Sequence, residues 1–243
     1  MTPSLTPLEW EALGLSLKVA LWATLASLPL GVLTAWVLAR TRFPGHGLLN
    51  GIVHLPLVLP PVVVGYALLV LLGRQGPLGG WLYDSFGITL AFTWKGAAVA
   101  AAVMAFPLMV RAMRLSLEAV DAGLEQAART LGAGPAKVFV TITLPLMLPG
   151  VLTGTVLAFA RALGEFGATI TFVSNIPGET RTLPLALYSF TQVPGGEDGA
   201  MRLAIIAVVV ALAALVVSEV LARRVQRMTQ GVDAPAQPEH RRV

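Results

Sequence analysis

Apolar residues dominate this chain of 243 residues and gather in long runs. A helix that crosses a bilayer needs roughly 20 mostly apolar residues, because the hydrocarbon core is about 30 Å thick and each helical residue rises about 1.5 Å. Runs of that length occur at residues 14–39, 50–73, 89–113, 139–162 and 201–222. The pattern predicts an all-α polytopic membrane protein with five transmembrane helices.

The second run is unusual because it contains three prolines within the sequence HLPLVLPPVVVG. Pro56, Pro60 and Pro61 each lack a backbone N–H and bend a helix. This run is either an ordinary span that tolerates its prolines or a bent helix that lines a path or gate.

Residues 163–200 are half apolar but are interrupted by Gly, Pro and charged residues. This pattern fits either a sixth span or an external loop with re-entrant pieces. Non-helical backbone at membrane depth is tolerated only where it is buried in protein or lines water. Beyond a membrane domain at 1–228, residues 229–243 are polar and contain proline, and we expect them to form a disordered cytoplasmic tail.

Charged residues make up only 12% of the chain, whereas soluble domains carry roughly 25%. This composition also indicates an integral membrane protein. Lys and Arg prefer the cytoplasmic flanks of spans, so an N-terminus outside the membrane places most of them correctly. The basic residues then predicted inside are Arg40, Arg42, Arg111, Arg114, Arg129, Lys137, Arg223, Arg224, Arg227, Arg241 and Arg242.

A polar insert at residues 115–138 separates the third and fourth runs and is predicted to be a cytoplasmic loop. Asp121 is a suitable N-cap and Gly132 a suitable left-handed stop, with Pro135 beyond it. A short helix is therefore expected at 122–131.

This short helix has one apolar face and one charged pair. A helix of about ten residues is marginal alone in water, so something must cover its apolar face. The cover is either the membrane surface or the chain's own bundle, or else a groove on a partner. The face consists of Leu124, Ala127, Ala128 and Leu131. Glu125 and Arg129 are expected to form an i, i+4 ion pair on another face.

The insert resembles the EAA motif of permease subunits in binding-protein-dependent ABC importers. That motif reads E-A-A, three residues, G, nine residues, I-x-L-P. The matching residues here are Glu125, Ala127, Ala128, Gly132, Ile142, Leu144 and Pro145, with one residue between the glutamate and the alanine pair. The resemblance implies that these residues couple the chain to a cytoplasmic ATPase through a coupling helix.

The resemblance covers roughly residues 10–225 and favours molybdate permeases, above all in the segment FVSNIPGETRTLPLALYSF. It implies a helix bundle like that of type I importers, in a bacterial inner membrane, that translocates the molybdate oxyanion. The partners implied are a cytoplasmic ABC ATPase dimer, a second copy of the chain, a periplasmic molybdate-binding protein and membrane lipid. Nucleic acid is not among them.

The chain itself is not expected to be an enzyme. It has no G-x-x-x-x-G-K-[ST] loop, so the resemblance implies that ATP and Mg²⁺ are bound by the partner ATPase. It also has no cysteine, which excludes disulfides and thiolate metal sites. His54, the only histidine in a predicted span, has no partner at metal-ligand spacing. No cofactor or metal is expected in this chain.

Candidate residues for the anion path lie at the outer end of the fourth run. Arg161 and Glu165 are one helical turn apart, and they form either an ion pair at the membrane interface or part of the path or gate. Four residues that could donate hydrogen bonds to an oxyanion follow closely: Thr169, Thr171, Ser174 and Asn175.

Other functions remain open on the residues alone. A sulfate or tungstate permease would share the same motif. A secondary anion transporter would need a coupling-ion site deep in the membrane, and Glu165 and Glu219 are the only acidic residues near spans. An anion channel would conduct without ATP, and ATP dependence of uptake would separate it from an importer.

Overall fold

The computed structural model describes residues 6–230, without the side chains of 218, 219 and 221–230. The predicted tail lies almost entirely outside this range. The helices are α1 (Pro7–Arg40), α2 (His46–Val58), α3 (Pro61–Leu72), α4 (Pro77–Phe86), α5 (Trp94–Glu118), α6 (Ala122–Thr130), α7 (Pro135–Val138), α8 (Leu144–Leu163), α9 (Gly167–Val173), α10 (Leu183–Thr191) and α11 (Glu197–Gln230). A π-helical turn, η1 (Phe139–Thr143), joins α7 to α8.

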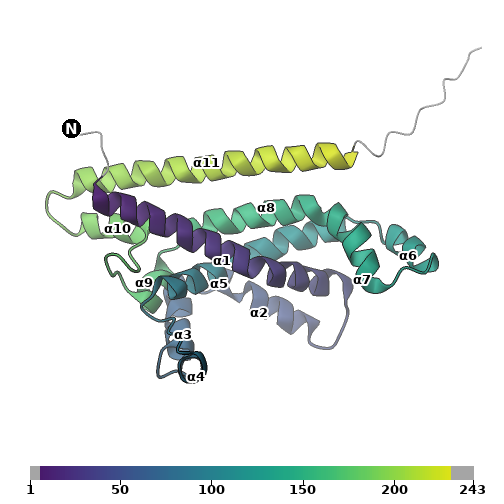
Figure 1. Cartoon of the computed structure of the whole chain (residues 1–243), viewed down its shortest axis with the longest axis horizontal. Coiled ribbons are helices and arrows are strands. Elements are labelled where there is room, and N and C mark those ends of the chain that lie inside the picture. The colour runs from purple at the N-terminus through teal and green to yellow at the C-terminus, as the bar shows by residue number, and fades with distance from the viewer. Residues whose placement is uncertain (1–5, 231–243) are drawn as a thin grey trace, which may run out of the picture.

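Four long helices, α1, α5, α8 and α11, form the bundle and run along the long axis of the molecule (Figure 1). α5 packs against both α1 and α8 and is the most buried of them. Small residues allow this close packing. A Cβ added to Gly154 of α8 would lie 2.8 Å from the carbonyl oxygen of Met109 on α5, so that position has no room for a side chain.

The length and hydropathy of the described helices agree with the predicted membrane protein. Four segments are long and apolar enough to cross a bilayer, namely Pro7–Arg40, Trp94–Glu118, Pro135–Leu163 and Glu197–Val217. The third predicted span, 89–113, corresponds to α5, which begins five residues later and continues to Glu118. The polar insert therefore starts inside α5. Likewise, the last four residues of the insert form α7.

The second predicted span is not one straight helix. It is a pair, α2 and α3, bent by 116° at a short break, and together they supply the fifth candidate crossing. Leu59 and Pro60 have extended ψ angles of 143° and 134°. Two consecutive prolines explain the break, because each lacks an N–H and disfavours helical geometry in the residue before it. The bend is therefore confirmed, while a role of this helix pair in lining a path or gate stays a prediction.

The described part of residues 163–200 contains no helix long enough to be a sixth span. It folds into α9, of seven residues, and α10, of nine, before α11 begins. The loop with short helical pieces is therefore what the structure shows. α9 packs tightly on α3: a Cβ on Gly65 would lie 2.5 Å from the carbonyl oxygen of Ala168.

The bundle has two ends that differ in structure (Figure 1). The α6 end holds the last residues of α1 and α5, the start of α2, and α6 and α7. The opposite end holds the start of α1, α9, α10 and the start of α11. There, Arg202 of α11 forms an ion pair of 3.0 Å with Glu9, whose side chain is fully buried.

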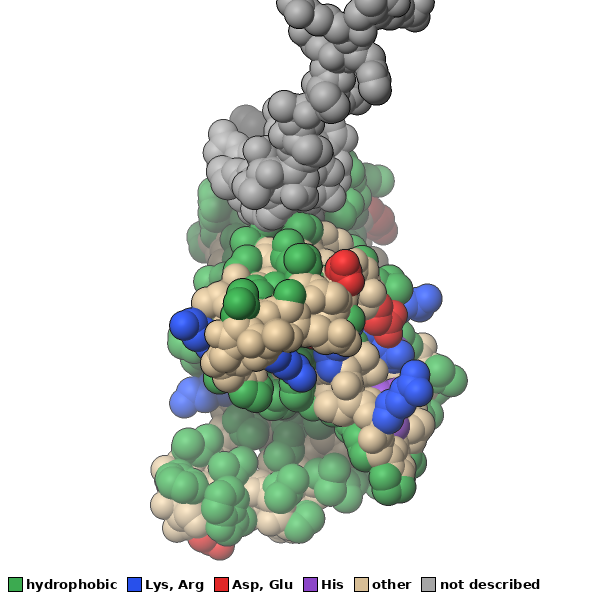
Figure 2. All heavy atoms as spheres, turned by 90° about the vertical axis from the view of Figure 1, so that its right-hand side faces the viewer, with side chains coloured by type: hydrophobic (Ala, Val, Ile, Leu, Met, Phe, Trp, Pro, Cys, Tyr) green, Lys and Arg blue, Asp and Glu red, His purple; other side chains and the backbone are tan. Residues whose placement is uncertain are grey.

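Basic residues mark the α6 end. Figure 2 looks onto this end and shows Lys and Arg side chains spread among hydrophobic side chains and atoms of other kinds. The described basic residues here are Arg40, Arg42, Arg111, Arg114, Arg129 and Lys137. They are the members of the set predicted to be cytoplasmic whose side chains are described, and they lie together at one end of the bundle.

Candidate functional site

The short helix predicted in the polar insert is present as α6, with both of its expected caps. The carboxylate of Asp121 accepts a hydrogen bond of 2.7 Å from the backbone N–H of Gly123. Gly132 has φ +86°, in the left-handed region. Its N–H donates to the carbonyl of Arg129, and the N–H of Ala133 donates to that of Ala128. This is a Schellman C-cap, which glycine adopts without strain.

The apolar face of α6 is left uncovered by the chain itself. Leu124 is 50% exposed and Leu131 88% exposed, Ala127 is also exposed, and Ala128 is half-buried. The bundle therefore does not cover this face. A face of small and apolar side chains on a capped helix has the form of an element that docks into a groove.

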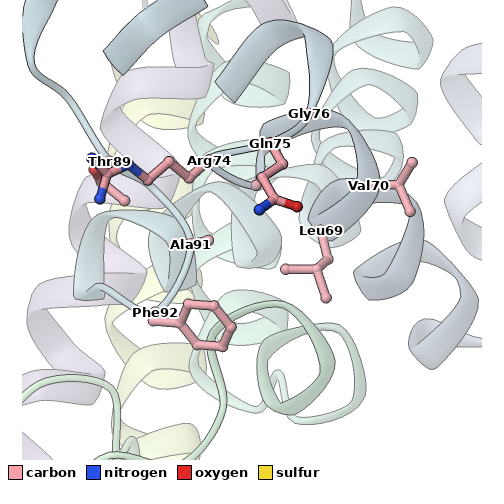
Figure 3. A pocket seen from close by; sticks show the side chains of 9 residues that line it. Leu69, Val70, Arg74, Gln75, Gly76, Thr89, Ala91 and Phe92 are labelled. Atoms are coloured by element: carbon pink, nitrogen blue, oxygen red, sulfur yellow. The ribbon is translucent and has the colours of Figure 1, made fainter. Parts of the chain in front are cut away.

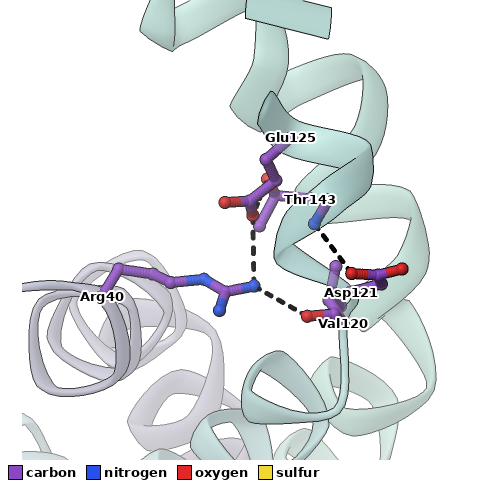
Figure 4. A network of polar contacts seen from close by, with 6 residues as sticks. Arg40, Val120, Asp121, Glu125 and Thr143 are labelled. Atoms are coloured by element: carbon purple, nitrogen blue, oxygen red, sulfur yellow. Dashed lines mark hydrogen bonds and ion pairs between the residues drawn. The ribbon is translucent and has the colours of Figure 1, made fainter. Parts of the chain in front are cut away.

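Glu125 is the one buried residue of α6, and it points into the protein (Figure 4). Its Oε1 accepts a hydrogen bond of 2.8 Å from the hydroxyl of Thr143 and one of 3.2 Å from Nη2 of Arg40. The same Nη2 donates to the carbonyl oxygen of Val120 at 3.1 Å. The predicted Glu125–Arg129 pair is wrong, because Arg40 from a distant segment takes the carboxylate.

The inward position of Glu125 changes how the motif aligns. Counted back from Gly132, the position of the motif glutamate falls on Gln126, which is exposed on α6. The alanine pair then follows without a gap. Glu125 is therefore an additional acidic residue next to the motif, with partners inside its own chain.

The second half of the motif lies on the π-turn and the first turn of α8. Ile142 and Leu144 are half-buried, and Pro145 is exposed. Pro145 lacks an N–H and so cannot satisfy a carbonyl of the preceding turn, which fits the local widening to a π-turn. Thr143, the last residue of η1, is buried and directs its hydroxyl to Glu125.

At the opposite end, Arg161 and Glu165 form the ion pair that was one of the two alternatives for them, and their part in a path or gate stays a prediction. Nη1 of Arg161 lies 2.7 Å from Oε2 of Glu165, whose side chain is 2% exposed. The other carboxylate oxygen accepts a hydrogen bond of 2.8 Å from the N–H of Ala168. Glu165 therefore holds the last turn of α8 to the first turn of α9.

The four other path candidates fall into two groups. Thr169 is buried on α9, and Thr171 donates its hydroxyl back to Gly167 of the same helix. Asn175 bridges to α10: its Nδ2 donates to Ser189 at 2.7 Å, and its Oδ1 accepts from Nε of Arg181 at 2.9 Å. Ser174, which directly follows α9, has φ +65°. In this structure, the hydroxyl of Thr171 bonds within α9, and the side-chain amide of Asn175 holds the turn after α9 to α10 and Arg181.

One hollow was not predicted from the sequence. It has a volume of about 550 Å³ and lies between the end of α3 and residues 89–92 (Figure 3). Leu69, Val70, Ala91 and Phe92 give it apolar walls, while Arg74 and Gln75 lie at its edge. The guanidinium of Arg74 stacks over the ring of Tyr83, 4.0 Å from its centroid. Its two walls, the end of α3 and residues 89–92, are separated in the sequence by α4, so no local sequence signal marks the hollow.

Comparison with known proteins agrees with this arrangement. Residues 27–229 match the family model described as binding-protein-dependent transport system inner membrane component. The chain belongs to this permease family. Among the described residues of this permease, no cluster of His, Cys, Asp or Glu could hold a metal ion.

Curated relatives of the permease are named as molybdenum permeases. This chain is 67% identical to the molybdenum transport system permease protein ModB of Escherichia coli K12, over 90% of this chain and 96% of that protein. The corresponding protein of Haemophilus influenzae is 59% identical over the same shares. A probable sulfate permease, cysT of Chlorokybus atmophyticus, is 40% identical over 71% of this chain and 60% of its own length.

Solved structures share the fold of the permease. A bacterial ABC transporter that imports the acidic polysaccharide alginate contains a chain that matches with a TM-score of 0.72 at 18% identity, over 90% of this chain and 80% of that one. A chain of the methionine transporter MetNI matches with a TM-score of 0.65 at 17% identity, over 89% and 94%. The fold is therefore that of an ABC-importer permease.

Proposed function

We propose that this chain is the membrane-spanning permease of an ATP-driven importer that translocates molybdate. The 67% identity to a molybdenum permease, maintained over 90% of the chain, carries this proposal. Identity to the probable sulfate permease is lower and covers less of both chains. Sulfate, another tetrahedral dianion, is therefore the second candidate substrate, and tungstate the third.

The proposed complex contains two copies of this chain, an ABC ATPase dimer and an external molybdate-binding protein. The uncovered face of α6 supports an ATPase groove as its occupant, with Ala127, Ala128 and Gly132 as the coupling residues. ATP and Mg²⁺ then belong to the ATPase, and this chain supplies no cofactor site. The α6 end is cytoplasmic and the opposite end, with Arg161 and Glu165, faces outward.

Substrate identity is tested in a bacterium that lacks its own molybdate permease. Cells that carry this chain with its ATPase and binding protein are grown in limiting molybdate and excess sulfate, and cell molybdenum is measured by mass spectrometry. We expect the intact chain to restore molybdenum and a Gly132→Val variant to fail. Unchanged molybdenum together with restored sulfate uptake would assign the chain to sulfate instead.

The orientation is tested by labelling, because the chain has no cysteine of its own. Thr130→Cys places one thiol on the exposed surface of α6, and Gln192→Cys places one after α10 at the opposite end. A membrane-impermeant maleimide added to spheroplasts is expected to label the second variant, and the first only after the membrane is opened. The reverse pattern would contradict the proposed orientation.

A further inference from the structure

Four segments of the chain meet at one carboxylate oxygen and one guanidinium nitrogen. We call this set the clamp: Arg40, the carbonyl of Val120, Glu125 and Thr143 (Figure 4). Arg40 is the last residue of α1, Val120 lies between α5 and α6, and Thr143 precedes α8. The clamp therefore joins α6 to the ends of all three central helices of the bundle.

The clamp provides the direct bond between α6 and α1. Otherwise the main helical neighbours of α6 are α7 and η1, which lead into α8. None of the apolar side chains of α6 is buried. Without the clamp, α6 would be linked mainly to α5 and α8, its neighbours along the chain.

The clamp is poorly suited to a purely stabilising role. Nε of Arg40 is buried and has no hydrogen-bond partner among the described residues. A buried donor without a partner carries a free-energy penalty that offsets part of the gain from the two bonds of Nη2. Replacement of a buried ion pair by apolar side chains is often neutral or stabilising, so stability alone does not require a charged pair here. What the charged pair adds is a directional bond between α6 and α1.

We propose that Arg40 is a positioning residue for transport, which through Glu125 makes α1 move together with α6. The proposal rests on the proposed function, because it takes the ATPase to be what moves α6. Movement of α6 then reaches α1 through Arg40 and α8 through Thr143, so α1 and α8 shift as one unit on either side of α5. Glu125 acts inside the chain and leaves Gln126 and the alanine pair to face the partner.

The test uses the whole complex in proteoliposomes. The binding protein is supplied on the side of the membrane that the opposite end faces, and ATP on the side that the α6 end faces. The readout is molybdate accumulated per ATP hydrolysed. The key variant is Arg40→Met with Glu125→Gln, which removes both charges and leaves no unpaired carboxylate. The matched control is Arg114→Met with Glu118→Gln, an ion pair of 2.7 Å at the same end. Arg114 also donates a hydrogen bond to Asn50 of α2, and among the described residues neither side chain forms a hydrogen bond or ion pair with α6.

We expect the Arg40/Glu125 double variant to insert and to retain the ATPase, while its molybdate-to-ATP ratio falls at least about fivefold, the lower range of measured coupling effects. The control is expected to keep the wild-type ratio. A wild-type ratio in the double variant, or an equal fall in the control, would overturn the clamp proposal. A wild-type complex that imports no molybdate would instead overturn the proposed function on which it rests.

A second measurement reports the motion itself. Spin labels at Arg42→Cys, just after α1, and Thr130→Cys, at the end of α6, give the distance between the two segments. With the clamp intact we expect one narrow distribution, the same with and without trapped ATP. In the Arg40→Met, Glu125→Gln background the distribution should broaden and shift on ATP trapping. An unchanged distribution in that background would contradict the linked motion.

Discussion

Two buried carboxylates, one at each end of the bundle, are held in different ways. Glu165, in the link just after α8, pairs with Arg161 in the last turn of α8 and with the N–H of Ala168 in α9, so these partners lie within four residues. Glu125 pairs with Arg40, 85 residues away, and with Thr143, 18 residues away. The geometry at Glu165 is therefore fixed locally, while that at Glu125 depends on how α1 and α8 lie.

This difference suggests different mechanical behaviour at the two ends. A locally closed network keeps its shape when helices shift against one another, so α8 and α9 should move as one piece. Through the Gly65 contact, α9 would carry α3 with it. A network that spans distant segments must either transmit their relative motion or break. The networks of Glu165 and Glu125 therefore offer a rigid joint and a link that responds to movement.

The largest expected effect is at the rigid joint. Arg161→Met leaves the carboxylate of Glu165, 2% exposed, with its backbone donor but without its counter-ion. We expect a loss of about 2–3 kcal/mol of stability, below the range for a fully buried pair because Arg161 is partly exposed. Thermal unfolding of the detergent-solubilised protein measures this loss. Adding Glu165→Gln should recover part of it, and no recovery would argue against an unpaired charge as the cause.

A smaller loss is expected at the clamp. Arg40→Met leaves Glu125 with the hydroxyl of Thr143, and the two charged side chains are 20% and 11% exposed. Thermal unfolding should therefore show a loss of about 1–2 kcal/mol, because the two bonds of Nη2 to Glu125 and Val120 are lost while the unpartnered Nε is removed with them. Transport should fall more than stability does. If instead stability falls more than in Arg161→Met, the clamp holds the fold together and the contrast between the ends is wrong.

Local features of the chain were predictable from the sequence, and long-range ones were not. Asp121 and Gly132 cap α6 as expected because a cap depends only on residues within one helical turn. Intrinsic preference favours a glutamate that precedes its basic partner, as in Glu125–Arg129, over the order in Arg161–Glu165. The structure has the second pair and not the first, because the sequence could not show that Arg40 lies beneath α6.

The same limit explains the second run. Pro56, Pro60 and Pro61 made a bent helix one of the two alternatives, since the loss of backbone N–H groups is a local property. The 116° angle between α2 and α3 was not predictable. It is associated with the close approach of α9, which requires glycine at position 65 and brings together residues about 100 positions apart.

A pair of glycines separates backbone strain from coupling. Gly132 after α6 and Gly87 after α4 have φ +86° and +66°, and neither has atoms within 4 Å of an added Cβ. Replacement of either by alanine should cost about 1 kcal/mol of stability, from the left-handed conformation alone. Only Gly132→Ala should also lower molybdate uptake, because only α6 is proposed to meet the ATPase. Equal uptake by both variants would remove Gly132 from the coupling residues.

The smallest effect is expected for Arg129, the partner that local spacing predicts for Glu125. Arg129→Ala removes an exposed side chain on α6 that forms no ion pair among the described residues. Its cost should stay below about 0.5 kcal/mol in thermal unfolding, as for other surface charges. The variant that combines Arg129→Ala with Arg40→Met should then be about as stable as Arg40→Met alone, because Glu125 gains nothing from Arg129. A larger loss in the combined variant would mean that Arg129 takes over the carboxylate when Arg40 is absent. The long-range link would then have a local substitute, and the two ends would differ less than their geometry indicates.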